Sequence, residues 1–192
     1  MKMRAAIAGA LVAVALIVPA NASAYLTWFE FVRQSNSASR LTMVWQYGPG
    51  WYGTQSWRAG SGVSTDACWV GHGWLPTGYY DLKGHWDSYN GAIAGRVFYL
   101  QNKPCWNGTW RTELFIHSEE TASQSQYCPT AYDDPFCWEG DYDYYSNGCV
   151  KVAHQGATPT DIRLVHDGWH GKSGDSRHGY FTINNWLYVY DY

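Results

Sequence analysis

Missing from the 192-residue sequence are internal repeats, linker-like stretches and low-complexity tracts, so repeat arrays and strings of domains are excluded. Positive charge is also scarce: 13 Lys and Arg face 16 Asp and Glu, which gives a formal net charge of −3. A chain with this balance lacks the basic surface that binds nucleic acid. The sequence is therefore most simply interpreted as one domain that does not bind nucleic acid.

A spanning run of roughly 20 apolar residues is lacking as well. The N-terminal segment "MKMRAAIAGALVAVALIVPANASA" has a basic start, a shorter apolar stretch interrupted at Pro19, and small residues at its end. This pattern predicts a signal peptide over residues 1–24 and cleavage before Tyr25, with a retained membrane anchor as the alternative. Removal would bring the net charge from −3 to −5. We expect the remaining 25–192 domain to be secreted or to reside in the cell wall, without stable membrane insertion.

Helix-forming runs are few, whereas Gly (20), Trp (12) and Tyr (16) are abundant. This composition favours a mainly β fold with many turns. The pattern predicts one or two short helices, the clearest in "TPTDIRLVHDG" with Thr160 as cap and Gly168 as stop. The segment "GPGWYG" is predicted as a loop. Strands are predicted in residues 26–48 (two, around the turn "QSNSAS"), 56–64, 79–82, 94–101, 112–118, 149–153 and 183–192.

The five cysteines are an odd number, which in a secreted chain leaves one thiol unpaired or paired between chains. Cys128 and Cys137 bracket a short Pro- and Asp-containing segment that a disulfide would close. We expect Cys149 to be free, so Cys68 and Cys105 pair by elimination. The count alone permits any one of the five to be free, with three pairings of the rest.

A reactive cysteine needs a neighbour that accepts its proton, usually histidine. Of the seven histidines, His117 is the best placed, because it ends the apolar strand "ELFIH". Cys149 begins another strand, and Gly148 before it has no side chain to block approach to the thiol. Two such strand ends side by side would bring imidazole and sulfur together. The alternative is a strand-end histidine bonded to a carbonyl and an inert buried cysteine.

The segments "IHSEE" and "SNGCVKV" together resemble the L,D-transpeptidase catalytic domain, also called YkuD-like, whose signature is a histidine followed downstream by Ser/Thr-x-Gly-Cys and an apolar residue. "LPTGYYDL" is similar to the family's Thr-Pro-x-Gly-aromatic strand, although its first residue is Leu75. The resemblance covers roughly residues 57–152. It implies a single-domain, β-sandwich-like catalytic fold.

The resemblance implies that Cys149 is the nucleophile and His117 the base. The backbone carbonyl of Ser118 would orient the imidazole, and the amides of Gly148 and Cys149 would face the oxyanion. The hydroxyl of Ser146 would hold the loop.

Three features depart from the family pattern. Asn147 stands where histidine is common, and Lys151 where arginine or asparagine is common. The gap between His117 and the cysteine is longer, which suggests a disulfide-closed insertion over residues 119–145. Its acidic residues suggest a lid that attracts a substrate amine, with a solvated acidic loop as the alternative. The residues expected to contact substrate are Tyr145, Ser146, Asn147 and Lys151.

The sequence thus predicts an exported cysteine acyltransferase that cleaves the L,D bond of peptidoglycan stem peptides and cross-links stems. An L,D-carboxypeptidase or wall-degrading toxin would use the same site with water as acceptor. A secreted, non-catalytic module that binds wall glycan is the alternative of another class. We expect a monomer without cofactor or metal: His166 and His170 flank Gly168 without a following acid, and Asp141 and Asp143 lack the other ligands of a calcium loop.

Overall fold

A computed structural model describes residues 26–35, 38–125, 144–153, 161–175, 178–180 and 185–192. The predicted signal peptide and the predicted Cys128–Cys137 pair lie outside these ranges. Within them the mainly β prediction is confirmed, with a nine-stranded sheet, a small two-stranded sheet and one helix. The elements are β1 (Thr27–Arg33), β2 (Arg40–Gly48), β3 (Trp51–Gly60), β4 (Gly78–Asn90), β5 (Ala94–Leu100), β6 (Lys103–Pro104), β7 (Trp110–Arg111), β8 (Phe115–His117), β9 (Val150–Val152), α1 (Asp161–Ser173), β10 (Gly179–Tyr180) and β11 (Trp186–Asp191).

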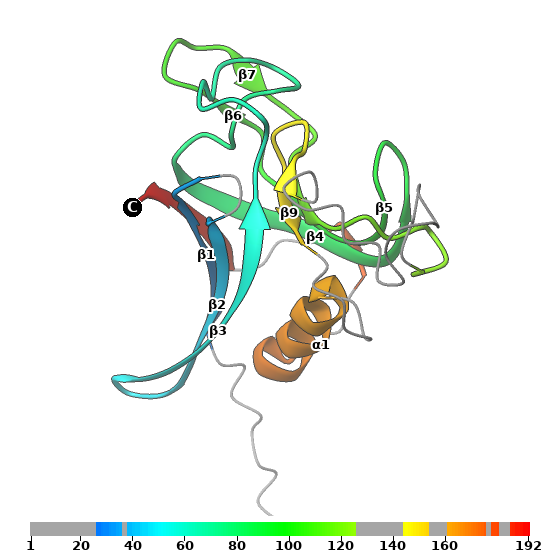
Figure 1. Cartoon of the computed structure of the whole chain (residues 1–192). Helices are drawn as coiled ribbons and strands as arrows, with labels where there is room; N and C mark the ends of the chain where they lie inside the picture. Colours follow the sequence, from blue (N-terminus) through cyan, green and yellow to red (C-terminus); the bar gives the residue numbers. More distant parts are fainter. Residues whose placement is uncertain (1–25, 36–37, 126–143, 154–160, 176–177, 181–184) are drawn as a thin grey trace, which may run out of the picture.

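The large sheet has the order β10-β4-β11-β1-β2-β3-β9-β8-β5, and an additional pairing of β4 with β5 makes it barrel-like (Figure 1). Most neighbours are antiparallel, but β1 with β11 and β8 with β9 run parallel. The long strand β4 shifts register at 82/84 and again at 86/89 in its pairing with β5. Such irregularities bend a strand, so β4 pairs with β11 near its start and with β10 further along.

Helix α1 lies against β1, β2 and β5 and covers the main apolar core (Figure 1). The fully buried Trp169 stacks on Phe29 at 5.1 Å between ring centroids and meets Phe98 edge-on at 5.4 Å. The predicted helix end at Gly168 is wrong, because the helix continues to Ser173. A Cβ at Gly168 would lie 2.8 Å from Met43 Cε, so glycine is retained here for close packing against β2 and does not end the helix.

The prediction that "GPGWYG" is a loop is wrong from Trp51 onward. Pro49 and Gly50, the latter with a φ of 75°, form a tight turn, and Gly48 pairs with Trp51 so that β3 begins at once. The strand predicted over residues 79–82 is also longer, since β4 extends to Asn90. No helix in the described ranges is long and apolar enough to cross a membrane.

Candidate active site

The parallel pairing of β8 with β9 places His117 and Cys149 on one face of the sheet. Ile116 pairs with Val150 and His117 with Lys151, so Cys149, one residue before β9, lies diagonally across from His117. Side chains alternate between faces along a strand. Accordingly Ile116 and Val150 belong to the main core, whereas Cys149 packs in a separate apolar cluster on the other face. The two residues singled out from the sequence are therefore neighbours.

Cys149 is a free, buried thiol, 7 % exposed. It donates to the carbonyl of Glu113 at 3.6 Å, and among the described residues no hydrogen bond joins it to His117. Burial raises the pKa of Cys149 to about 11, although hydrogen bonding to the Phe115 backbone and the charge of Arg111 act to lower it. In this conformation the cysteine is a protonated thiol that must turn away from Glu113 to react.

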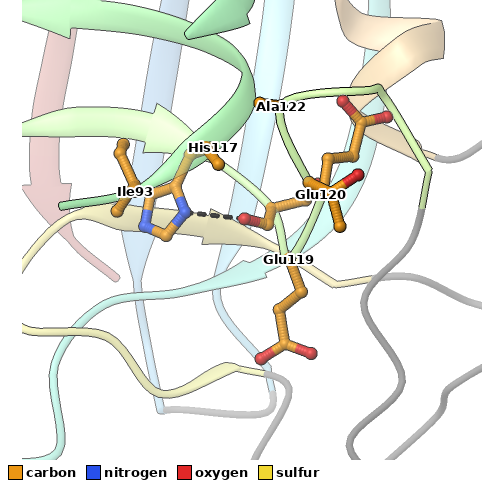
Figure 2. Close-up of a pocket in the computed structure, with 8 residues that line it drawn as sticks. Ile93, His117, Glu119, Glu120 and Ala122 are labelled. Carbon is orange, nitrogen blue, oxygen red and sulfur yellow. Dashed lines mark hydrogen bonds between the residues drawn. The ribbon is translucent and has the colours of Figure 1, made fainter. Parts of the chain in front are cut away.

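The imidazole of His117 is held by the backbone carbonyl of Ser118, at 2.8 Å from Nδ1 (Figure 2). A carbonyl only accepts hydrogen bonds, so this contact places the proton on Nδ1 and leaves the Nε2 lone pair as the basic site. Burial lowers the pKa of His117 to about 4. The ring is therefore neutral near pH 7, which is the form a general base needs.

His117 also lines a pocket of about 390 Å³ (Figure 2). The other lining residues are Ile93, Ala94 and the segment 118–122 that follows β8. Two acidic side chains at the pocket are already paired, Glu119 with Lys151 and Glu120 with Arg96. The pocket therefore lies on the histidine side of the pair.

Gly148 adopts a φ of 108°, a conformation that favours glycine. A Cβ at this position would lie 1.8 Å from Arg111 Nη2. The Ser146 hydroxyl donates to the Cys149 carbonyl at 2.7 Å and accepts the Gly148 amide at 3.1 Å. Ser146 thus holds the loop as the resemblance implies, but the Gly148 amide, expected at the oxyanion, is bonded to Ser146 in this conformation.

The other three residues predicted to contact substrate differ in how deeply they are buried. Lys151 is buried and forms an ion pair with Glu119. Asn147 is exposed, and its carbonyl accepts a hydrogen bond from Arg111 at 3.3 Å. Tyr145 is half-buried. Asn147 and Tyr145 are therefore the two that solvent reaches most readily.

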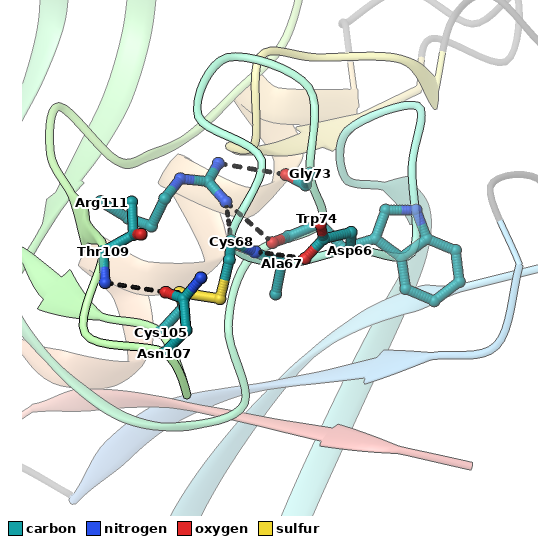
Figure 3. Close-up of a disulfide and its surroundings, with 9 residues drawn as sticks. All are labelled: Asp66, Ala67, Cys68, Gly73, Trp74, Cys105, Asn107, Thr109 and Arg111. Atoms are coloured by element: carbon teal, nitrogen blue, oxygen red, sulfur yellow. Dashed lines mark hydrogen bonds between the residues drawn. A yellow bond between two sulfur atoms is a disulfide. The ribbon is translucent and has the colours of Figure 1, made fainter.

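Arg111 is a supporting residue that the sequence analysis missed. It is 2 % exposed, and its guanidinium donates to the carbonyls of Ala67, Gly73 and Trp74 (Figure 3). It also donates to the carbonyl of Asn147. It joins the loop before the nucleophile to the loop that carries Cys68. Arg111 is an isolated arginine in the two-residue strand β7, and no sequence pattern signals this role.

The predicted disulfide between Cys68 and Cys105 is confirmed, with 5.5 Å between their Cα atoms (Figure 3). The Cys68 amide donates to Asp66 Oδ1 at 2.9 Å, which fixes the turn around the bridge. The disulfide and Arg111 together brace one side of the nucleophile loop.

Glu113, also missed, has a φ of 54°, which is unusual for a residue with a side chain. Its carbonyl is the group that accepts the Cys149 thiol. Backbone strain often lies at functional sites, and here the strained residue faces the candidate nucleophile.

A histidine cluster lies on the α1 face of the sheet, away from Cys149. His166 and His170 come from α1, His85 and Asp87 from β4, and His178 precedes β10. One ligand nitrogen from each of His85, His166 and His170 lies within 4.8 Å of the others. The sequence indicates only the α1 pair, because no local pattern shows that β4 supplies further ligands.

No protein-family model matches the chain, and neither the comparison with curated proteins nor that with solved structures found a match.

Proposed function

We propose that the chain is an exported cysteine acyltransferase, of the L,D-transpeptidase type, that acts on peptidoglycan stem peptides. The observation that carries the proposal is the placement of Cys149 and His117 on one face of paired strands, with Nδ1 held at 2.8 Å from the Ser118 carbonyl. The substrate class comes from the resemblance of the surrounding motifs. Residues 1–24 and the disulfide support export.

In the proposed reaction the Cys149 thiol gives its proton to His117 Nε2 as sulfur attacks the carbonyl carbon of the L,D bond. The C–N bond breaks, and His117 returns the proton to the leaving amine. The acyl group is then a thioester on Cys149. The amine of a second stem attacks that thioester and gives a proton to His117 Nε2. The C–S bond breaks, sulfur takes that proton back as the thiol, and a new amide joins the two stems.

The first step requires the thiol to turn from Glu113 towards His117. Such a change is a rotation about the Cα–Cβ bond between staggered positions. A thiol with a pKa raised to about 11 beside a neutral imidazole is unreactive until this rotation occurs. Substrate that displaces the Glu113 contact would therefore activate the nucleophile at the time of binding.

The pocket beside His117 is proposed as the acceptor side, since the base must lie close to the amine that attacks. Its ion pairs fix Glu119 and Glu120 in the wall. An acceptor amine would meet carboxylates whose charge is partly balanced by Lys151 and Arg96, which limits how strongly it is held.

The test is incubation of the purified protein with stem tetrapeptides of a bacterial wall, followed by mass analysis. Cross-linked dimers made by the parent and absent with Cys149→Ala support transfer. Shortened stems alone indicate that water is the acceptor, and the activity is then that of an L,D-carboxypeptidase. The variant His72→Ala lies outside the site and should behave as the parent; dimers made equally by Cys149→Ala would contradict the proposal.

A second candidate function is binding of wall glycan without catalysis, favoured by exposed tryptophans beside the disulfide. Trp69 follows Cys68, Trp106 follows Cys105, and these two side chains are 54 % and 84 % exposed. Exposed indole rings are suited to stacking on sugars. Wall binding by a parent protein that makes neither dimers nor shortened stems would favour this candidate.

A further inference from the structure

We propose that His85, His166 and His170 form a binding site for a divalent transition-metal ion of the zinc type, with Asp87 orienting His166. The site is separate from the proposed acyltransferase site and does not depend on it, because Cys149 and His117 lie on the opposite face of the sheet.

The spacing of the imidazoles is close to that of a metal site. The three ligand nitrogens lie within 4.8 Å of one another, and the ring centroids of His85 lie 5.7 Å from His166 and 4.9 Å from His170. In a tetrahedral zinc site with Zn–N distances near 2.1 Å, two nitrogens are about 3.4 Å apart. Small changes in side-chain torsions would close that difference.

Two nitrogens are buried without a hydrogen-bond partner among the described residues, Nε2 of His166 and Nε2 of His170. His166 is 1 % exposed, and its ring centroid lies 4.3 Å from that of Phe98. A buried polar atom without a partner is uncommon and calls for an explanation. A metal ion would coordinate both lone pairs at once.

Asp87 prepares His166 for this role. Its Oδ1 lies 3.1 Å from His166 Nδ1, and its Oδ2 lies 3.4 Å from His178 Nε2. An acceptor at Nδ1 keeps the proton there and turns Nε2 into the ligand atom, as carboxylates do for metal-bound histidines. His178, partly exposed at the edge of the cluster, lies where a fourth ligand would approach.

The ligand set also indicates the kind of ion and its effect. Neutral imidazoles suit zinc, copper, nickel and iron ions and are poor ligands for calcium or magnesium. Because His166 and His170 come from α1 and His85 from β4, the ion would join the helix to the barrel-like sheet. It would therefore stabilise the folded chain by binding it in preference to the unfolded one.

The experiment is a titration of the chelator-treated chain with Zn²⁺ against a chromophoric chelator, with unfolding temperature as a second readout. We expect one ion per chain and a higher unfolding temperature with Zn²⁺. His170→Ala and His166→Gln should lose both effects, and Asp87→Asn should weaken binding about 10- to 100-fold. His72→Ala and Cys149→Ala should bind as the parent does.

Failure of the parent to bind Zn²⁺ would overturn the proposal, as would unchanged binding in folded His170→Ala. Far-UV circular dichroism establishes whether each variant folds. If His166→Gln does not fold, zinc binding by His170→Ala is the test, because His170 is half-exposed and its substitution disturbs the core less. Absorption of the Co²⁺-loaded parent provides a check on geometry, since a tetrahedral nitrogen site predicts intense visible bands and a hydrated surface ion does not.

Discussion

Strands β4, β5, β8 and β9 carry different chemistry on their two faces. One face holds Cys149 and His117 beside an apolar cluster that includes Phe115, and the other holds the histidine cluster beneath α1. Successive residues of a strand alternate between the two faces. His85 pairs with Phe98 on the α1 face, and the next residue, Trp86, pairs with Val97 on the thiol face. On the thiol face, the loop of residues 146–148 directly before Cys149 positions the thiol. On the α1 face, the histidines come from β4 and α1, which are distant in sequence.

Burial acts on the histidines of both faces in the same direction. It lowers the pKa of His117 to about 4 and that of His85 to about 3. The neutral imidazole of His117 is suited to act as a base on one face, and that of His85 is suited to act as a metal ligand on the other. One physical cause thus supports two proposed functions.

The largest expected effect is a loss of stability on the thiol face, caused by a substitution at Gly148. Gly148→Ala places a Cβ against Arg111 and keeps a positive φ, so we expect the free energy of unfolding to fall by about 4 kcal/mol. Gly108→Ala is the matched control, because Gly108 has a φ of 87° and open space around it. Denaturant unfolding should show a clearly smaller loss for Gly108→Ala. Equal losses would mean that Arg111 yields easily and does not brace the loop.

The next effect concerns acid stability on the thiol face. The pKa of His117 is about 4 in the fold and 6.5 in the unfolded chain, so between these values the unfolded chain binds more protons. The contribution of His117 to the free energy of unfolding is fully present above about pH 6.5. It decreases by about 3 kcal/mol as the pH falls towards 4. His117→Gln should flatten that part of the pH profile measured by denaturant unfolding. An unchanged profile would show that His117 takes up protons in the fold as readily as in the unfolded chain.

The smallest effect concerns the α1 face and two glycines of the same helix. Gly171→Ala meets open space and should stabilise the fold by up to about 1 kcal/mol, because alanine favours helix. Gly168→Ala gains the same propensity but pushes Met43, so we expect a net loss of about 1 kcal/mol and weaker Zn²⁺ binding through displaced His166 and His170. Thermal unfolding and the zinc titration measure both effects. Identical behaviour of the two variants would contradict the packing argument.

Local patterns predicted more of the thiol face than of the α1 face. Apolar alternation and turn residues predicted the strand that carries His117 and the strand that Cys149 precedes, and the odd cysteine count predicted a free thiol. The parallel pairing of β8 with β9 could not be predicted, since pairing is set by the whole sheet and not by either strand. The Glu113 carbonyl and Arg111 were missed for the same reason.

The histidine cluster was beyond local reasoning. His85 follows the register shift at 82/84 in β4, and only this irregularity together with the packing of α1 brings it beside His166. Helix propensity predicts a stop at Gly168. Close packing against Met43 overrides propensity there, which is a tertiary effect.

The central claim is that Cys149 is a nucleophile made reactive by His117. Its most direct test is intact mass after incubation with a carbapenem, which acylates cysteines of the proposed class. We predict one adduct on the parent, slower labelling of His117→Ala and no adduct on Cys149→Ala. A folded parent that takes no label, or equal labelling of Cys149→Ala, would contradict the claim.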